Sequence, residues 1–271
     1  MLTLLDSRAR PGGRQSNSRG RAVAHVATTM IACALSAAAF GQPVAPADGA
    51  APAIIPYEAR NPQNAAGDRL AEPRRLAAAV SAQWSRNPRK IVDVGSFTGE
   101  YLEAFLERFA QAKGQWTEPV DTNRTIARRR FERFTDRVDY VVGCPGRDIS
   151  LGCIPADTDI LISSWLTIHR DLDGVRAFHR AAFRQLPSGG VVAIIDHAGG
   201  NAAWRAVMAT ARKDAVGLGL AAAWEGPPVH HPEFSTPTSA QQVEAMRNAG
   251  FTDVTVLWTR LDTFLYIGRK P

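Results

Sequence analysis

Short apolar runs alternate with amphipathic segments along the second part of the chain. The apolar runs cover residues 90–94, 114–118, 138–143, 158–164 and 190–196. Between them, segments 99–113, 121–134 and 171–186 carry apolar residues at helical spacing. Because strands that alternate with helices form a parallel sheet covered on both faces, the pattern predicts an α/β domain.

The pattern changes on either side of this region. Residues 68–85 form a predicted helix ahead of it, and residues 238–250 form another behind it. Residues 251–258 and 261–268 then indicate two strands joined by a short turn. We expect these last strands to be antiparallel and appended to the parallel sheet.

The first part of the chain has the composition of a targeting segment. A basic, Ser/Gly-rich stretch leads into an Ala-rich apolar run at 22–39, followed by small residues at the spacing of a signal-peptidase site. We therefore predict a signal peptide or targeting segment at 1–41, a disordered Pro/Ala-rich linker at 42–66, and a folded domain at 67–271. Export is the favoured destination. An organelle transit peptide, or a cytoplasmic protein with a misassigned start codon, is the alternative.

Charge and membrane signals narrow the list of partners. The net charge is +6, but five arginines and one aspartate in the first 40 residues supply +4 of it. The remaining +2 does not call for a nucleic-acid partner. Polar residues interrupt the Ala-rich run, so no stable membrane span is expected once the leader is removed. A local basic cluster indicates a solvated helix face rather than a binding surface; its members are Arg124, Arg128, Arg129, Arg130, Arg133 and Arg137.

The cysteines leave two interpretations open. Beyond the leader only Cys144 and Cys153 remain. In an oxidising compartment they would close a loop of about ten residues with a disulfide, and otherwise they are two buried thiols. With no histidine beside them they do not form a zinc site, and we expect no metal.

The most informative motif lies at residues 90–100. The apolar run ends in a loop with Gly95 and Gly99 that opens directly into a helical segment. Glycines let the backbone approach a ligand, and the start of a helix offers free N–H groups. A strand, a glycine loop and a helix in this order predict a nucleotide-type site.

Ligands of open α/β sheets bind beyond the carboxyl ends of the strands, so we expect four strand ends to form the site. The first end supplies Asp93, Gly95, Ser96, Thr98 and Gly99. Glu118, 19 residues after Gly99, ends the second and can accept both hydroxyls of a ribose, with an ordinary surface carboxylate as the alternative. Asp148, after the third, is either an acceptor for an adenine amino group or a simple turn aspartate. Ser163, Ser164 and Trp165 close the floor of the crevice at the fourth.

Taken in order along the chain, these motifs resemble class I S-adenosylmethionine-dependent methyltransferases. The matching segments are Asp93-Val94-Gly95-Ser96-Phe97-Thr98-Gly99, Glu118, Asp148, 159–164, 187–190 and Ala249-Gly250-Phe251. The resemblance spans about residues 67–271. It implies a Rossmann-like, doubly wound, seven-stranded sheet with the last strand antiparallel, and S-adenosyl-L-methionine as the cofactor. A narrower resemblance to predicted exported bacterial methyltransferases implies the bacterial periplasm. It rests on the leader, the Asp68-Arg69 helix, Asp196-His197-Ala198 and the final Gly268-Arg269-Lys270-Pro271.

One position departs from the family pattern. Phe97 stands where these methyltransferases usually carry the middle glycine of the first loop. A ring that faced the ligand would block the approach of the backbone, whereas a ring that faced the sheet would be harmless.

We therefore predict methyl transfer from S-adenosylmethionine to a small-molecule acceptor. His197, Asp196 and His169 are candidate general bases at the rim of the crevice, although structural or solvated histidines are more common. Residues 199–237 are expected to form part of the acceptor pocket or a lid.

Two other classes of function were weighed against this one. A non-catalytic ligand- or partner-binding protein on the same fold is the main alternative, since the cofactor is made in the cytoplasm. A nicotinamide-dependent reductase is disfavoured, because the only Tyr and Lys four residues apart are Tyr266 and Lys270, in the last predicted strand.

Overall fold

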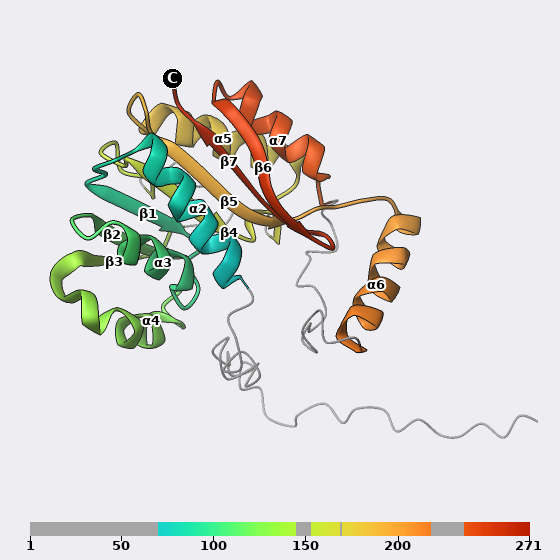
Figure 1. The fold of residues 1–271 in the computed structure, drawn as a ribbon, viewed down its shortest axis with the longest axis horizontal. Helices are drawn as coiled ribbons and strands as arrows, with labels where there is room; N and C mark the ends of the chain where they lie inside the picture. Colours follow the sequence, from blue (N-terminus) through green and yellow to red (C-terminus); the bar gives the residue numbers. More distant parts are fainter. Residues whose placement is uncertain (1–69, 145–152, 169, 218–235) are drawn as a thin grey trace, which may run out of the picture. The chain divides into compact units, whose positions relative to one another are not determined.

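The computed structural model describes residues 70–144, 153–168, 170–217 and 236–271, and within this part of the chain one seven-stranded sheet has the order β3-β2-β1-β4-β5-β7-β6 (Figure 1). Its strands are β1 (Lys90–Val94), β2 (Lys113–Glu118), β3 (Val138–Val142), β4 (Ile160–Ser164), β5 (Val191–His197), β6 (Thr252–Arg260) and β7 (Thr263–Arg269). Strands β1 to β5 pair in parallel, whereas β7 is antiparallel to both β5 and β6. The predicted doubly wound sheet with a reversed last strand is therefore confirmed.

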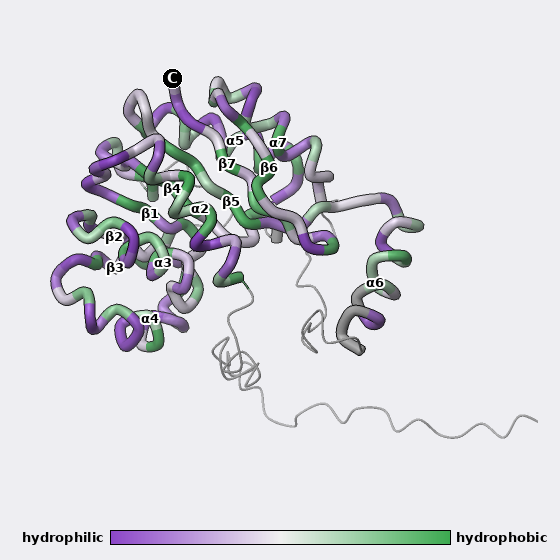
Figure 2. The backbone as a smooth tube through the Cα atoms, viewed as in Figure 1, coloured by the Kyte–Doolittle hydropathy of each residue, from purple (hydrophilic) through white to green (hydrophobic). Residues whose placement is uncertain are grey.

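Helices cover both faces of this sheet. The helices of the described ranges are α2 (Ala71–Trp84), α3 (Glu100–Arg108), α4 (Arg124–Phe131), α5 (Leu172–Gln185), α6 (Ala202–Gly217) and α7 (Ser239–Asn248), with 3₁₀ helices at Glu132–Arg137 and Leu166–Ile168, and α6 contributes no residue to the two cores beside the sheet. Neighbouring strand residues point to opposite faces, so Ile91 joins the core beneath α2, α3 and α4 while Val92 joins the core beneath α5 and α7. Figure 2 shows hydrophobic residues along β4 and β5 and mainly hydrophilic residues in α4.

Local sequence signals explain where the later helices begin and end. Asp171 precedes α5, and its carboxylate accepts the N–H of Gly174 at 2.9 Å. Thr238 and Gln241 form a reciprocal capping box at the start of α7. Gly250, with φ +108°, follows the end of α7 in the left-handed conformation that glycine adopts without strain.

The segment expected to form a pocket or lid contains a helix that the sequence analysis missed. Helix α6 occupies Ala202–Gly217, where alanines favour a helix but no clear apolar stripe marks one. Trp204 and Val207 on this helix are 47% and 56% exposed. Residues 218–235 of the predicted lid lie outside the described residues, as do the predicted leader and linker.

Within the described ranges, no helix is both long enough and apolar enough to span a bilayer. Cys144 and Cys153 form a disulfide. Of the two interpretations of these cysteines, the structure therefore contains the bridge.

Part of the arginine cluster contacts α3 and is not the solvated face that the sequence indicated. Arg137 donates hydrogen bonds to the carbonyls of Leu106, Phe109 and Ala112, at the end of α3. These carbonyls have no intrahelical partner, so the guanidinium caps the helix. Arg130 binds the other end of α3, as described below.

Candidate functional site

The carboxyl ends of β2, β1, β4 and β5 lie next to one another in the sheet. Those of β1, β2 and β4 are three of the four ends predicted to form the site, whereas Asp148, the predicted residue after β3, lies outside the described residues. Gly95 follows β1, Glu118 ends β2, Trp165 follows β4, and His197 ends β5. Because these strands lie side by side in the order β2-β1-β4-β5, the four residues lie along one edge of the sheet.

The loop between β1 and α3 has an unusual backbone. Gly95, Phe97 and Gly99 all have positive φ, at +73°, +49° and +92°. The amides of Gly95 and Ser96 donate to the carbonyl of Thr117 at 3.0 and 3.2 Å, which ties the loop to β2. A Cβ at Gly99 would overlap the ring of Phe131, so packing as well as backbone conformation requires glycine there.

Hydrogen bonds at both the amide and the carbonyl of Phe97 hold its backbone in the left-handed region. Its amide donates to Oε1 of Glu118 at 2.6 Å, and its carbonyl accepts the indole N–H of Trp116 at 2.9 Å. The left-handed conformation costs an L-residue about 1–2 kcal/mol, so these two contacts from β2 stabilise a shape that glycine would adopt freely.

Glu118 lies beside this loop with little exposure to solvent. Its side chain is buried, and burial raises the pKa of the carboxyl to about 7 in spite of the opposing hydrogen bond from Phe97. A carboxylate at the end of β2, next to a glycine loop, is placed to accept hydroxyl groups of a ligand.

Asp93 lies beneath the loop and is completely buried. Burial, and then the charge of Glu118, raise its pKa to about 8, while Arg74 and Ser96 act in the opposite direction. Its side chain therefore faces the protein interior under α3, so a direct contact with a ligand stays a prediction.

The hydroxyl groups predicted to bind the cofactor are used inside the protein. Ser96 donates to the carbonyl of Asp93 at 2.6 Å and accepts the amide of Thr117 at 3.1 Å. Ser163 donates to the carbonyl of Val94 at 2.7 Å, and Thr98 donates to Glu100. These side chains build the loop, and what part they take in ligand binding remains untested.

The ends of β4 and β5 bring an indole and an imidazole together. His197 stacks on Trp165 with ring centroids 4.2 Å apart and planes inclined by 20°. Nδ1 of His197 lies 3.9 Å from Oδ1 of Asp262, in the turn between β6 and β7. A histidine beside a carboxylate at a strand end is a reasonable acid–base group.

Asp196 is the neighbour of His197 but faces the other side of the sheet. It is fully buried and accepts hydrogen bonds from the amide of Thr167 at 3.0 Å, from its hydroxyl at 2.6 Å, and from the amide of His197 at 2.7 Å. Burial raises its pKa to about 7. Asp196 thus fixes the turn after β4, and a catalytic part for it stays a prediction.

Two further candidate residues, Asp148 and His169, lie outside the described residues. His179, which the sequence analysis did not single out, is fully buried with Nε2 3.2 Å from the hydroxyl of Tyr266, and burial lowers its pKa to about 3. It is a packed core histidine rather than a functional group.

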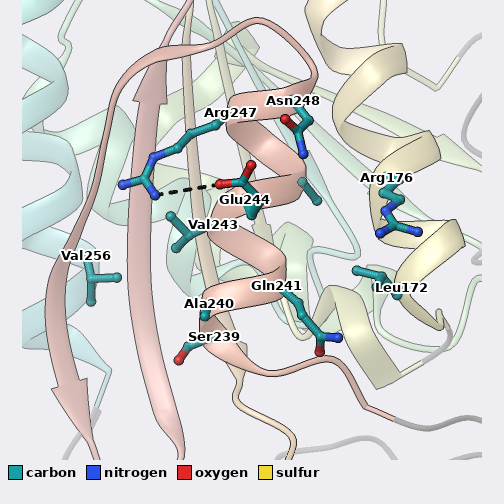
Figure 3. A pocket seen from close by; sticks show the side chains of 11 residues that line it. Leu172, Arg176, Ser239, Ala240, Gln241, Val243, Glu244, Arg247, Asn248 and Val256 are labelled. Carbon is teal, nitrogen blue, oxygen red and sulfur yellow. Dashed lines mark ion pairs between the residues drawn. The ribbon is translucent and has the colours of Figure 1, made fainter.

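A separate groove of about 590 Å³ lies among α5, α7 and β6 (Figure 3). Leu172, Val243 and Val256 line it together with Arg176 and the ion pair between Glu244 and Arg247, whose charged atoms are 4.0 Å apart. None of the predicted site residues lines it. Among the described residues, no group of three or more His, Cys, Asp or Glu could hold a metal ion.

Two residues that shape the loop, Trp116 and Arg130, were not predicted from the sequence. Trp116 binds the backbone of Phe97, and Arg130 binds the backbone of Thr98 at 2.8 Å. A signal for Arg130 was present, since Arg130, Arg133 and Arg137 repeat the three- and four-residue spacing of Glu100, Glu103 and Glu107.

No protein-family profile matches this chain, and no curated protein matches its sequence. Solved structures do match its fold. An O-methyltransferase family protein from Burkholderia thailandensis aligns with a TM-score of 0.57 and 19% identity, over 79% of this chain and 59% of that one. The S-adenosylmethionine-dependent methyltransferase SibL aligns with a TM-score of 0.52 and 16% identity, over 74% and 55%.

A protein described as possibly exported, from Bordetella parapertussis, aligns with a TM-score of 0.56 and 16% identity, over 74% of this chain and 67% of that one. The chain thus spans less than two thirds of the two methyltransferases, at 59% and 55% of their lengths. The seven-stranded sheet, its strand order and these alignments agree: the protein has the class I methyltransferase fold.

Proposed function

We propose that this protein is an S-adenosylmethionine-dependent methyltransferase that acts on a small-molecule acceptor, with residues 67–271 as its catalytic domain. The observation that carries the proposal is the contact between Glu118 and the amide of Phe97, at 2.6 Å. It places a carboxylate from the end of β2 against a loop whose backbone turns through three positive-φ positions.

The residues present suit such a cofactor. Glu118 offers a carboxylate to the ribose hydroxyls, and a Cβ at Gly95 would find only the carbonyl of Ser164, at 3.8 Å, so the backbone there is open to close approach. The first turn of α3 follows the loop directly and presents N–H groups.

S-adenosylmethionine supplies an electrophilic methyl group on a positively charged sulfur. The task of the protein is then to align the acceptor with that methyl group and to keep water away. Trp165 and His197 form a stacked wall at the next two strand ends. His197, supported by Asp262, takes the proton of an acceptor hydroxyl or amine, with His169 and Asp196 as the other candidates.

A non-catalytic ligand-binding protein is the second candidate. It is favoured by Phe97, since a side chain now stands where the fold usually has glycine. This second candidate is a ligand- or partner-binding protein on the same fold, and it transfers no methyl group.

We further propose that the protein is exported to the bacterial periplasm. The disulfide between Cys144 and Cys153 supports this, because disulfides persist in oxidising compartments. Neither a nucleic-acid partner nor a stable membrane span forms part of the proposal.

Transfer of a radiolabelled methyl group tests catalysis. The protein is incubated with methyl-labelled S-adenosylmethionine and pools of small nucleophiles, namely phenols, amines, thiols and carboxylates. We expect label in one pool, and loss of that label with Glu118→Ala. Tight binding without transfer to any pool would favour the second candidate.

A further inference from the structure

Arg130 bridges helix α4 to the glycine loop and to the start of α3. Its Nε donates to the carbonyl of Thr98 at 2.8 Å, and its two terminal nitrogens lie 2.9 Å from Oε1 of Glu100 and 2.9 Å from Oε2 of Glu103. One planar guanidinium therefore binds a loop carbonyl and two carboxylates of the first turn of α3.

The contact with Thr98 falls at the most constrained part of the loop. Thr98 stands between Phe97 and Gly99, both with positive φ, and its carbonyl has no place in the regular hydrogen bonding of α3. The residue after Arg130 reinforces this contact, because the ring of Phe131 packs directly against Gly99. Two consecutive residues of α4 thus define the path of the last two loop residues.

The environment makes this contact stronger than a surface ion pair. The side chains of Arg130, Glu100 and Glu103 are 23%, 17% and 22% exposed. Charge-assisted hydrogen bonds in such partly buried positions are about twice as strong as neutral ones, and the guanidinium has a fixed fork geometry that lysine cannot reproduce. Glu100 also lies in the first turn of α3, where the helix dipole stabilises a negative charge.

Arg133 shows what an ordinary member of the same cluster does. It pairs with Glu103 at 2.7 Å and also with Glu107, but its side chain is 54% exposed and both of these carboxylates lie on α3. The hydrogen bond to the carbonyl of Thr98 therefore distinguishes Arg130 from Arg133.

We propose that Arg130 is a positioning residue for cofactor binding: it holds Thr98, Gly99 and Glu100 in the conformation that presents the loop and the start of α3 to S-adenosylmethionine. This inference rests on the proposed function. Arg130 acts through the loop and does not touch the reacting atoms. Loss of its side chain leaves the carbonyl of Thr98 without this donor, so part of the binding free energy must then be used to order the loop.

The test compares Arg130→Met with Arg137→Met. Arg137 is a matched control because it also makes three hydrogen bonds to the α3 region, to the carbonyls of Leu106, Phe109 and Ala112, all remote from the loop. Affinity for S-adenosylhomocysteine is measured by calorimetry, well below the melting temperature of each variant. Hydrogen exchange of the amides of residues 95–100 is measured in the free proteins.

We expect Arg130→Met to weaken binding by about 10-fold or more and to speed exchange in the loop. Arg137→Met should lower the melting temperature while changing the affinity by less than about 2-fold. Arg130→Lys should recover only part of the affinity. If Arg130→Met does not fold, Glu100→Gln replaces it in the test. This variant removes the charge of one carboxylate partner of Arg130, and it should also weaken binding of S-adenosylhomocysteine.

Equal affinities of the wild type and Arg130→Met, or equal losses in both methionine variants, would overturn the positioning role. Failure of the proposed function looks different, because the wild-type protein itself would then not bind S-adenosylhomocysteine.

Discussion

Oε1 of Glu118 accepts the amide proton of Phe97 at 2.6 Å, across the gap between the end of β2 and the loop that follows β1. The same carboxylate is the group best placed to accept ribose hydroxyls. Glu118 holds the loop, and under the proposed function it also binds the ligand, so a substitution must be chosen to tell these two roles apart.

Replacing Glu118 by glutamine and by alanine separates these roles. Glutamine keeps an oxygen that can accept from Phe97 but lacks the charge, whereas alanine removes both. We expect Glu118→Ala to weaken binding of S-adenosylmethionine by about 1–3 kcal/mol, with Glu118→Gln in between. Calorimetry measures both. An unchanged affinity in a folded Glu118→Ala variant would remove this residue from the site.

Phe97 offers a test of backbone strain. Phe97→Gly and Phe97→Ala both remove the ring, but only glycine adopts a φ of +49° without strain. The glycine variant should therefore be more stable than the alanine variant by about 1 kcal/mol, the reverse of the usual order. Urea unfolding measures the difference. A more stable alanine variant would show that the loop does not hold this conformation in solution.

The fold could be predicted because its signals are local. Apolar runs such as Ile91 and Val92 mark buried strands, and Gly95 and Gly99 mark the loop. Helix α6 was missed since its Ala-rich sequence has no clear apolar stripe. Its exposed Trp204 and Val207 do not follow the usual inside–outside pattern.

The site could be predicted only in outline. Gly95, Gly99 and Glu118 were found at the expected strand ends. The internal use of Ser96 and Ser163 could not be foreseen, because their partners Thr117 and Val94 belong to neighbouring strands. The same holds for Arg130, whose partners become visible only when α4 packs beside α3.

Buried carboxyls make the stability dependent on pH. Burial raises the pKa of Asp93 to about 8 and those of Glu118 and Asp196 to about 7, whereas the unfolded chain loses these protons near pH 4. Between pH 6.5 and 8 the folded state thus binds more protons, and the free energy of unfolding falls as the pH rises. Buried His179, with its pKa lowered to about 3, acts in the opposite direction, since stability from this group rises with pH between about 3 and the ordinary histidine pKa near 6.5.

The Asp93→Asn variant tests how much of this pH dependence comes from Asp93, the carboxyl with the highest pKa of the three. The variant cannot ionise at this position, so its stability should fall less steeply than that of the wild type across pH 6.5 to 8. Urea unfolding at three pH values measures the slope. Parallel slopes in the two proteins would contradict the assignment to Asp93.

The disulfide between Cys144 and Cys153 should contribute measurably to stability. Closing a loop of about ten residues is worth about 2–3 kcal/mol in the chain-entropy model. The double serine variant should lose that amount in urea unfolding, and mass spectrometry of oxidised protein should find no free thiol at either position. Two alkylatable thiols in such material would argue against both the bridge and export.

Ligand-dependent thermal unfolding tests the central claim most directly. At about 100 times the dissociation constant, a ligand that binds only the folded state adds about 2.7 kcal/mol, which for a domain of this size raises the melting temperature by about 5–10 °C. S-adenosylmethionine and S-adenosylhomocysteine should each produce this shift, and NADPH should not. An unchanged melting temperature with both S-adenosyl ligands, or a shift with NADPH alone, would contradict the assignment of this site to a methyl donor.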